Sequence, residues 1–447
     1  MKKTSKNSNE HLYKIINPCR NQLEFLPRCL DDIIPADHKV RQVWEFVEKM
    51  DINICYDEIL TLEGVAGRPT TSPKIILCLW IYSIMDGNIS ARKIEELCTY
   101  HNVYKWIAGG AAINRTMLSD FRSKNPEKFN ELLISCLAVM VKAGVLNDTD
   151  FAQDGTKVKA SAGSSSFRRE ETLEKLNNVI KTHVEDLEKD LIKDPKKYDE
   201  RTKAAKSRAA QESSERVEDA LNALKDIREE KIRQGKKKHR VITDEELENT
   251  RASTTDSEAR KMRMGDAGFR PAFNVQFATG VDSRVIFGVG VVNTLDPGTS
   301  PIMMGKVNNT LNALKMPSAK NWVADAAYSS KEDIDKVARL FPECNYYSPA
   351  KPRKGIDPKT HQRGDSENVK KWRDELDSPE MKNAYKHRCS TAEFSNAQTK
   401  NHGMTEVLIR GIEKVLAMAN LHAIAQNITR FFDLVSKYNC KTVSANG

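Results

Sequence analysis

The sequence predicts an α/β protein: a mixed sheet with helices on both faces, a helical hairpin inserted into it, and an all-helical N-terminal domain. Three observations lead to this prediction. Residues 1–147 show helical patterns almost throughout, whereas the stretch from Phe273 alternates with the period of two that is typical of strands. Between them, a long charged region carries apolar residues at helical spacing.

The composition is that of a soluble globular protein. A chain of 447 residues allows two or three domains, and the hydrophobic share of 39% provides at least one substantial core. The longest apolar run, Ile75–Met85, is too short to span a bilayer and predicts a buried helix. The first residues are basic and polar with no apolar segment behind them, so we expect no signal peptide and a cytoplasmic location.

The cysteine spacing and the net charge limit the kinds of site and partner that the protein can have. The nine cysteines form no C-x-x-C pair and show no regular spacing with the nine histidines, so we expect reduced thiols rather than structural zinc or a disulfide framework. The net charge of +9 permits a polyanionic partner without demonstrating one.

The N-terminal domain is expected to be a series of short helices joined by tight turns. One helix begins at Ser72-Pro73 and stops at Gly87, a second begins in "SARKIEELC", and a third pattern follows the glycine pair 109–110. This arrangement resembles a helix-turn-helix array, in which basic side chains could lie along DNA phosphates: Arg92, Arg115, Arg122 and Lys124. The alternative is a helical bundle with an ordinary solvated basic face.

A strand and the hairpin come next. The segment "NDTDFAQDGTKVKAS" has period-two character and predicts a strand that ends near Asp154. Apolar residues then recur every three or four positions from Leu173 to Leu191 and again from Val217 to Ile227, which predicts two helices. Their charged faces are most simply solvated, although "KKKHR" at 236–240 could touch phosphate.

The rest of the sheet follows the hairpin. "AFNVQFATGV" and "RVIFGVGVV" predict two strands, and a helix leads from 300 to the buried strand of "NWVADAAYSS", which ends at Asp325. A helix from Lys331, a short strand near "CNYYSPA" and a final helical region complete the order.

Three carboxylates then stand out: Asp154 and Asp325 at predicted strand ends, and Glu393 on a later helix. Sites of α/β folds form at the carboxyl ends of strands, and converging oxygen donors suit hard cations. Two Mg²⁺ ions on such carboxylates, for which Mn²⁺ can substitute, activate a water or a 3′-hydroxyl for attack on a phosphodiester. This order resembles that of a ribonuclease-H-like nucleotidyl transferase. Taken singly, each aspartate is more simply a turn or cap residue.

The stretch "AYKHRCSTAEFSNAQTKNHGM" carries the third carboxylate. On a helix, Glu393 and Lys400 lie two turns apart on one face, with Asn396 between them. Ser390-Thr391-Ala392-Glu393 also has the spacing of a capping box, so a helix start at Ser390 remains an alternative or an additional role.

The chain resembles the DDE transposases of bacterial insertion sequences, in the branch with an N-terminal helical domain. "QDGTKVKA", "GDAGFRPAFNVQFATG", "VADAAYSS" and above all "YKHRCSTAEFSNAQTKNHGM" carry the resemblance. The third-acid motif of that family is tyrosine, arginine, glutamate and lysine, with six residues between the last two, as between Glu393 and Lys400. One departure is that four residues separate Arg388 from Glu393, where the commonest form has three.

The resemblance implies roles for individual residues. Asp154, Asp325 and Glu393 would hold the metal ions and act as the catalytic triad. Lys400 and Arg388 would hold DNA phosphates, supported by Tyr385, with His387 as a substitute for the arginine. Arg270, in "DAGFRPAFNVQ", would help to shape a loop near the scissile phosphate, whereas His402 is expected to be a helix-end residue.

The resemblance also implies an activity. The protein would bind the terminal inverted repeats of its own element, nick the DNA by metal-activated water, and join the 3′-hydroxyl end to target DNA. It would act as a homodimer on double-stranded DNA, without a membrane, in the nucleoid of a bacterium. The alternatives are a catalytically inactive DNA-binding regulator and a metal-dependent nuclease without strand transfer.

The expected domains follow from these assignments. They are a helical DNA-binding domain at 1–147, a ribonuclease-H-like catalytic domain at 148–164 and 265–435, a helical hairpin insertion at 165–264, and a tail at 436–447.

Overall fold

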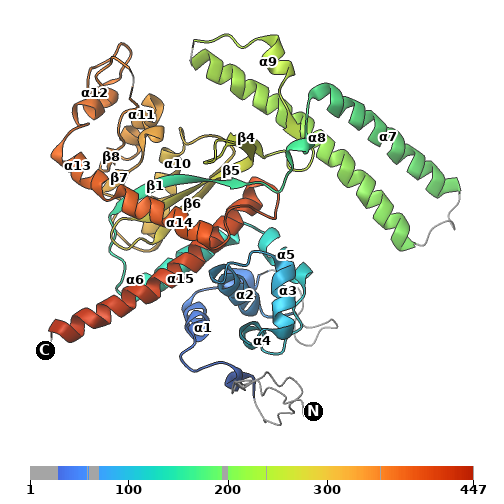
Figure 1. Ribbon diagram of the computed structural model, residues 1–447, viewed down its shortest axis with the longest axis horizontal. Helices are drawn as coiled ribbons and strands as arrows, with labels where there is room; N and C mark the ends of the chain where they lie inside the picture. Colours follow the sequence, from blue (N-terminus) through green and yellow to red (C-terminus); the bar gives the residue numbers. More distant parts are fainter. Residues whose placement is uncertain are drawn as a thin grey trace, which may run out of the picture.

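The computed structural model describes residues 29–57, 59, 70–193, 200–237, 239–352 and 354–445. A mixed sheet lies at the centre, short helices pack below it, and a long helical hairpin projects to one side (Figure 1). Seven cysteines belong to this described part and none of them forms a disulfide, whereas Cys19 and the side chain of Cys440 lie outside it. None of the described helices has the length and apolar character needed to cross a membrane.

The N-terminal region is helical, as the sequence predicts. Its helices are α1 (Lys39–Lys49), α2 (Pro73–Met85), α3 (Ala91–Tyr100), α4 (Asn102–Ala108), α5 (Arg115–Ser123) and α6 (Lys128–Lys142), with 3₁₀ turns η1 (Leu30–Ile33) and η2 (Asn53–Cys55). α2 begins at Pro73, whose missing N–H is not needed in the first turn. The Ser90 hydroxyl accepts the Lys93 N–H and caps α3.

The central sheet is mixed. Its strands are β1 (Asp150–Lys159), β4 (Arg260–Arg263), β5 (Phe269–Gly280), β6 (Ile286–Val292), β7 (Asn321–Val323) and β8 (Asn345–Tyr347). The order is β4-β5-β1-β7-β8, and β6 also pairs with β5. β5 is antiparallel to β1, β4 and β6, whereas β7 is parallel to β1 and β8. The expected strands β1, β5, β6, β7 and β8 are present in the expected order, and β4 is an additional strand of this sheet that the sequence does not predict.

Asp154 lies in the middle of β1, so the prediction that this strand ends near Asp154 is wrong. Every residue from Phe151 to Lys159 pairs with β5, which keeps the polar second half of the strand in the sheet. β7 pairs only with the first three residues of β1, so the second half of the strand is held in the sheet by β5.

Helices cover both faces of the sheet. They are α10 (Ser300–Ala313), α11 (Lys331–Leu340), α12 (Glu367–Asp374), α13 (Pro379–Lys386), α14 (Phe394–Asn401) and α15 (Ile412–Ala445). Met303 of α10 lies next to the β5 face that carries Gln276 and Ala278. Ser395 of α14 bonds to Thr279, which points to the opposite face of the same strand.

α15 joins the N-terminal helices to the sheet. It contacts α2, α5 and α6 on one side and β5 and β6 on the other (Figure 1). Residues 417–428 are buried without interruption, and the rings of Phe46 and Phe431 meet at 5.0 Å. The two regions consequently share one hydrophobic core across the expected boundary at residue 147. The expected tail at 436–447 continues α15 as far as Ala445.

The hairpin has a small core of its own. It comprises β2 (Phe167–Arg168), preceded by the 3₁₀ turn η3 (Ser164–Ser166), and α7 (Glu170–Lys193), α8 (Glu200–Lys237), α9 (Asp244–Glu248) and β3 (Ala252–Ser253). Leu173 of α7 packs against Val217 and Leu224 of α8. The two predicted helices are therefore present, although Lys238 of the basic "KKKHR" stretch lies outside the described residues.

Candidate active site

The sheet brings Asp154 and Asp325 together. Ala152 of β1 pairs with Val323 of the parallel strand β7, and each aspartate follows two residues later along its chain. Both carboxylates face the same guanidinium. Arg388 Nη2 lies 3.6 Å from Asp154 Oδ1 and 3.6 Å from Asp325 Oδ2. This cluster of two acids and one arginine is the candidate active site.

The other oxygen of each carboxylate is held by the protein. Asn396 Nδ2 of α14 donates to Asp154 Oδ2 at 3.0 Å. The Ala327 N–H donates to Asp325 Oδ1 at 2.7 Å, which makes Asp325 the cap of the 3₁₀ turn η4 (Ala326–Tyr328). The cap interpretation of Asp325 is thus correct, and it leaves the second oxygen facing the site. Both carboxylates are fixed in direction while each keeps one oxygen toward Arg388.

The surroundings of Asp154 disfavour a negative charge on its carboxyl group beside that of Asp325. The Asp154 side chain is only 18% exposed. Burial raises the pKa of Asp154 to about 6, against the lowering effect of the Arg388 charge, and the negative charges of Asp325 and Asp296 raise this pKa as well. The pair is therefore a place where an added cation is favoured.

Arg388 reaches the pair from an unusual helical segment. Residues Cys389–Glu393 (η5) form a π-helical turn between α13 and α14, and the backbone is helical on both sides of it. A π turn holds one residue more than an α turn. It accommodates the one-residue excess between Arg388 and Glu393, and it lets Arg388 point at the aspartates while α14 continues along the sheet.

The capping box predicted at Ser390 is wrong. Ser390 lies inside the π turn, and its hydroxyl donates to the His387 carbonyl rather than accepting a backbone N–H at a helix start. A cap requires the chain to enter the helix at that point, and here the helical backbone already begins upstream of Arg388.

The remaining motif residues divide into two groups. The Tyr385 ring lies 5.8 Å from the Arg388 guanidinium, so it belongs to the cluster. Glu393 and Lys400 are exposed. Within the part of the chain that the structure describes, no group of three His, Cys, Asp or Glu side chains could hold a metal ion, so Glu393 does not join the two aspartates here. His402 ends α14, as expected.

The other basic residues predicted to contact DNA lie far along the chain from this cluster. Arg270 pairs with Asp266 in the turn between β4 and β5. Arg115 is exposed at the start of α5, 3.9 Å from a Glu95 carboxylate oxygen. Arg122 is buried: its guanidinium lies 4.8 Å from the Trp80 ring and donates to the Ile89 carbonyl, and burial lowers its pKa to about 10. Arg122 is thus part of the helical core in this structure.

Sequence reasoning missed a buried polar network behind the carboxylates. Gln276 Nε2 donates to Asp296 Oδ1 at 3.0 Å, and the Tyr328 hydroxyl donates to Gln276 Oε1 at 2.6 Å. A Cβ atom at Gly155 would come within 2.2 Å of Gln276 Nε2, so the glycine of "QDG" permits a close approach and does not mark a turn. The available signal was the pair of amides in "FNVQF", which alternate with apolar residues in a strand buried on both faces.

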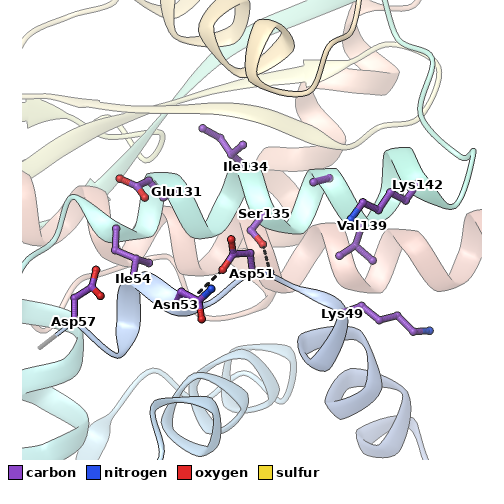
Figure 2. A pocket seen from close by; sticks show the side chains of 11 residues that line it. Lys49, Asp51, Asn53, Ile54, Asp57, Glu131, Ile134, Ser135, Val139 and Lys142 are labelled. Carbon is purple, nitrogen blue, oxygen red and sulfur yellow. Dashed lines mark hydrogen bonds between the residues drawn. The ribbon is translucent and has the colours of Figure 1, made fainter. Parts of the chain in front are cut away.

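A hollow of about 690 Å³ lies elsewhere, between η2 and α6 (Figure 2). The Asp51 N–H donates to Ser135 Oγ across its floor. Its lining includes Lys49, Glu131 and Lys142 but no residue of the carboxylate cluster. This hollow therefore plays no part in the candidate site.

The two carboxylates of the cluster are donors of the type that a divalent metal ion would bind. Two carboxylate oxygens, Asp154 Oδ1 and Asp325 Oδ2, already face one positive group from neighbouring strands. Oxygen donors of this kind are those that Mg²⁺ and Mn²⁺ prefer.

Two families match parts of the chain. The family described as "Transposase DDE domain" matches residues 341–432, a range that contains Tyr385, Arg388, Glu393 and Lys400. The family described as "Transposase domain (DUF772)" matches residues 28–124, the N-terminal helices. No curated protein and no solved structure matches the chain. With one transposase domain on either side of the hairpin, the chain is a DDE-type transposase of the kind encoded by insertion sequences.

Proposed function

We propose that this transposase binds the terminal inverted repeats of its insertion sequence, nicks the DNA there by hydrolysis, and transfers the 3′-hydroxyl end to target DNA. The observation that carries the proposal is the pair Asp154, in β1, and Asp325, two residues after the parallel strand β7, with one oxygen of each carboxylate facing one cation. DDE transposases act on DNA and use a divalent metal ion, typically Mg²⁺.

The sheet supports a ribonuclease-H-like catalytic domain. The strands β6, β5 and β1 are antiparallel to one another in succession, and β7 and β8 continue the sheet parallel to β1. The two aspartates come from β1 and from the end of β7, at the centre of that order. The proposed domain comprises residues 148–164 and 265–435, interrupted by the insertion at 165–264.

The chain's own residues position the reaction. Asp154 and Asp325 would hold the metal ion through the oxygens that Asn396 and Ala327 leave free. Glu393 is proposed as the third ligand on the basis of its place in the family motif. When bound, the metal would activate a water or a DNA 3′-hydroxyl as the nucleophile and would neutralise charge on the phosphodiester.

DNA contacts are proposed on two regions. Lys400 is exposed on α14, two turns from Glu393, where it would bind a phosphate near the cleaved bond. Arg115 is exposed on α5 in the N-terminal helices, which would recognise the terminal repeat. Because two element ends must be cut and joined together, we propose a homodimer on double-stranded DNA, located in the nucleoid.

The test is cleavage and joining of a labelled duplex that carries the DNA flanking the gene, with Mg²⁺ or Mn²⁺. Wild type is compared with Asp154→Asn, Asp325→Asn and Glu393→Gln, and with Asp282→Asn as a control carboxylate, exposed in the turn between β5 and β6. We expect the three site variants to bind DNA but neither cut nor join, and Asp282→Asn to behave as wild type.

The products separate this proposal from its alternatives. Joined molecules identify a transposase that completes strand transfer, cuts alone identify a nuclease, and binding without either identifies a regulator. Cleavage by Asp325→Asn at the wild-type rate would show that the carboxylate assignment is wrong.

A further inference from the structure

Arg388 occupies the position that a cation would take between the two aspartates. Its side chain is 9% exposed, and one nitrogen, Nη2, is equidistant from Asp154 Oδ1 and Asp325 Oδ2. We propose that Arg388 is the resident cation of the Asp154–Asp325 pair and that a divalent ion binds only by displacing its guanidinium. This inference rests on the proposed function, because it concerns the metal site assigned there.

The contacts hold Arg388 by charge and burial rather than by hydrogen bonds. A separation of 3.6 Å is too long for a hydrogen bond to either carboxylate. The buried Nε has no hydrogen-bond partner among the described residues, and Nη1 has only a weak contact of 3.8 Å to Cys389 Sγ. Moving the guanidinium therefore breaks two ion pairs but no strong directional bond.

The arginine and a metal ion need the same oxygens. Asp154 Oδ2 and Asp325 Oδ1 are already tied to Asn396 and to the Ala327 N–H. A new ligand would therefore use the two oxygens that face Arg388, of which Asp154 Oδ1 also accepts the Gly155 N–H at 2.9 Å and keeps a second lone pair. A divalent ion and a guanidinium beside the same two oxygens would repel each other strongly at low dielectric, so their occupancy is mutually exclusive.

The chain provides a route for the displacement. Arg388 directly precedes the π turn at Cys389–Glu393, an irregularity of the kind that is frequent at functional sites. The Tyr385 ring lies 5.8 Å from the guanidinium and offers it a second contact outside the carboxylate pair.

The experiment measures Mn²⁺ binding to the DNA-free protein at pH 7.5, by electron paramagnetic resonance of the free ion. We expect Arg388→Gln to bind Mn²⁺ about tenfold more tightly than wild type, because the competing charge is gone. Arg388→Lys keeps that charge and should stay within about threefold of wild type. Lys386→Gln is the matched control: it removes one positive charge from an exposed position two residues away and should change the affinity by less than about twofold.

Two results would overturn the inference. Unchanged or weaker Mn²⁺ binding by Arg388→Gln would show that the guanidinium does not compete, and equal tightening by Lys386→Gln would reveal a general charge effect. Asp325→Asn separates this failure from failure of the proposed function. If Asp325→Asn weakens Mn²⁺ binding but Arg388→Gln does not strengthen it, only the displacement is refuted; if Asp325→Asn has no effect, the proposed metal site itself is wrong. Circular dichroism of each variant verifies that it is folded.

Discussion

Asp154 destabilises the metal-free protein at neutral and alkaline pH. Its pKa is about 6 in the folded chain, against an ordinary value of 3.8. Because the folded-state pKa lies above the unfolded value, the folded protein binds the proton more tightly, and stability falls as the pH rises from about 4 to about 6. Asp154→Asn removes this titration while it keeps the shape of the side chain.

The magnitude follows from the shift. A shift of about two units corresponds to about 3 kcal/mol of unfolding free energy once the carboxylate is fully charged. Asparagine offers one acceptor oxygen in place of two, so it loses one of the bonds from Gly155 N–H and Asn396, at a cost of about 1 kcal/mol. We therefore expect Asp154→Asn to be more stable than wild type by about 2 kcal/mol at pH 8.

The assay is urea denaturation of both proteins in EDTA at pH 8 and pH 5. When the pH falls from 8 to 5, protonation of Asp154 raises the unfolding free energy of wild type by about 1.4 kcal/mol. The stability advantage of the variant should therefore be smaller by that amount at pH 5. Other titrating groups are common to both proteins and cancel in the difference. A variant that is less stable at pH 8, or an advantage that is the same at both pH values, would refute the reasoning.

Three further predictions concern the π turn, the DNA contacts and a buried histidine. Deletion of Ser390 should turn η5 into α-helix and rotate Arg388 by about 100° relative to Glu393, which abolishes cleavage while circular dichroism stays helical; retained cleavage would contradict this. Arg115→Ala and Lys400→Ala should each weaken duplex binding, measured by fluorescence anisotropy. Each should also reduce by about one the slope of the logarithm of the binding constant against the logarithm of the salt concentration; an unchanged slope would exclude a phosphate contact. Burial lowers the pKa of His422 to about 3, so the folded protein resists protonation at this site. The unfolding free energy of wild type should therefore fall by about 2 kcal/mol between pH 8 and pH 5, whereas that of His422→Leu should not fall for this reason. Equal losses for the two proteins in urea denaturation would disprove the prediction.

Local patterns predicted most elements correctly. Pro73 and Ser90 mark the starts of α2 and α3, because helix entry depends on a few adjacent residues. The alternation of Phe273, Val275 and Phe277 identifies β5, because side chains on a strand alternate between faces. Such signals need no knowledge of distant parts of the chain.

The parts that could not be predicted depend on contacts between distant residues. Asp154 stays inside β1 because its polar neighbours pair with β5, more than a hundred residues later. The π turn requires a shift of backbone bonding to which the sequence gives only one clue, the extra residue before Glu393. The sequence predicts Arg388 as a DNA-phosphate contact, and its place beside two aspartates follows only from the fold.

The shared core along α15 has a consequence for where the enzyme would cut. Because α15 packs against α2 and β6 at once, the N-terminal helices and the sheet that carries the aspartate pair belong to one packed unit. A protein that recognises a DNA sequence with one end of such a unit and cleaves with the other keeps a constant number of base pairs between the repeat that it binds and the bond that it breaks. The cleavage position would then be encoded in the length of a helix.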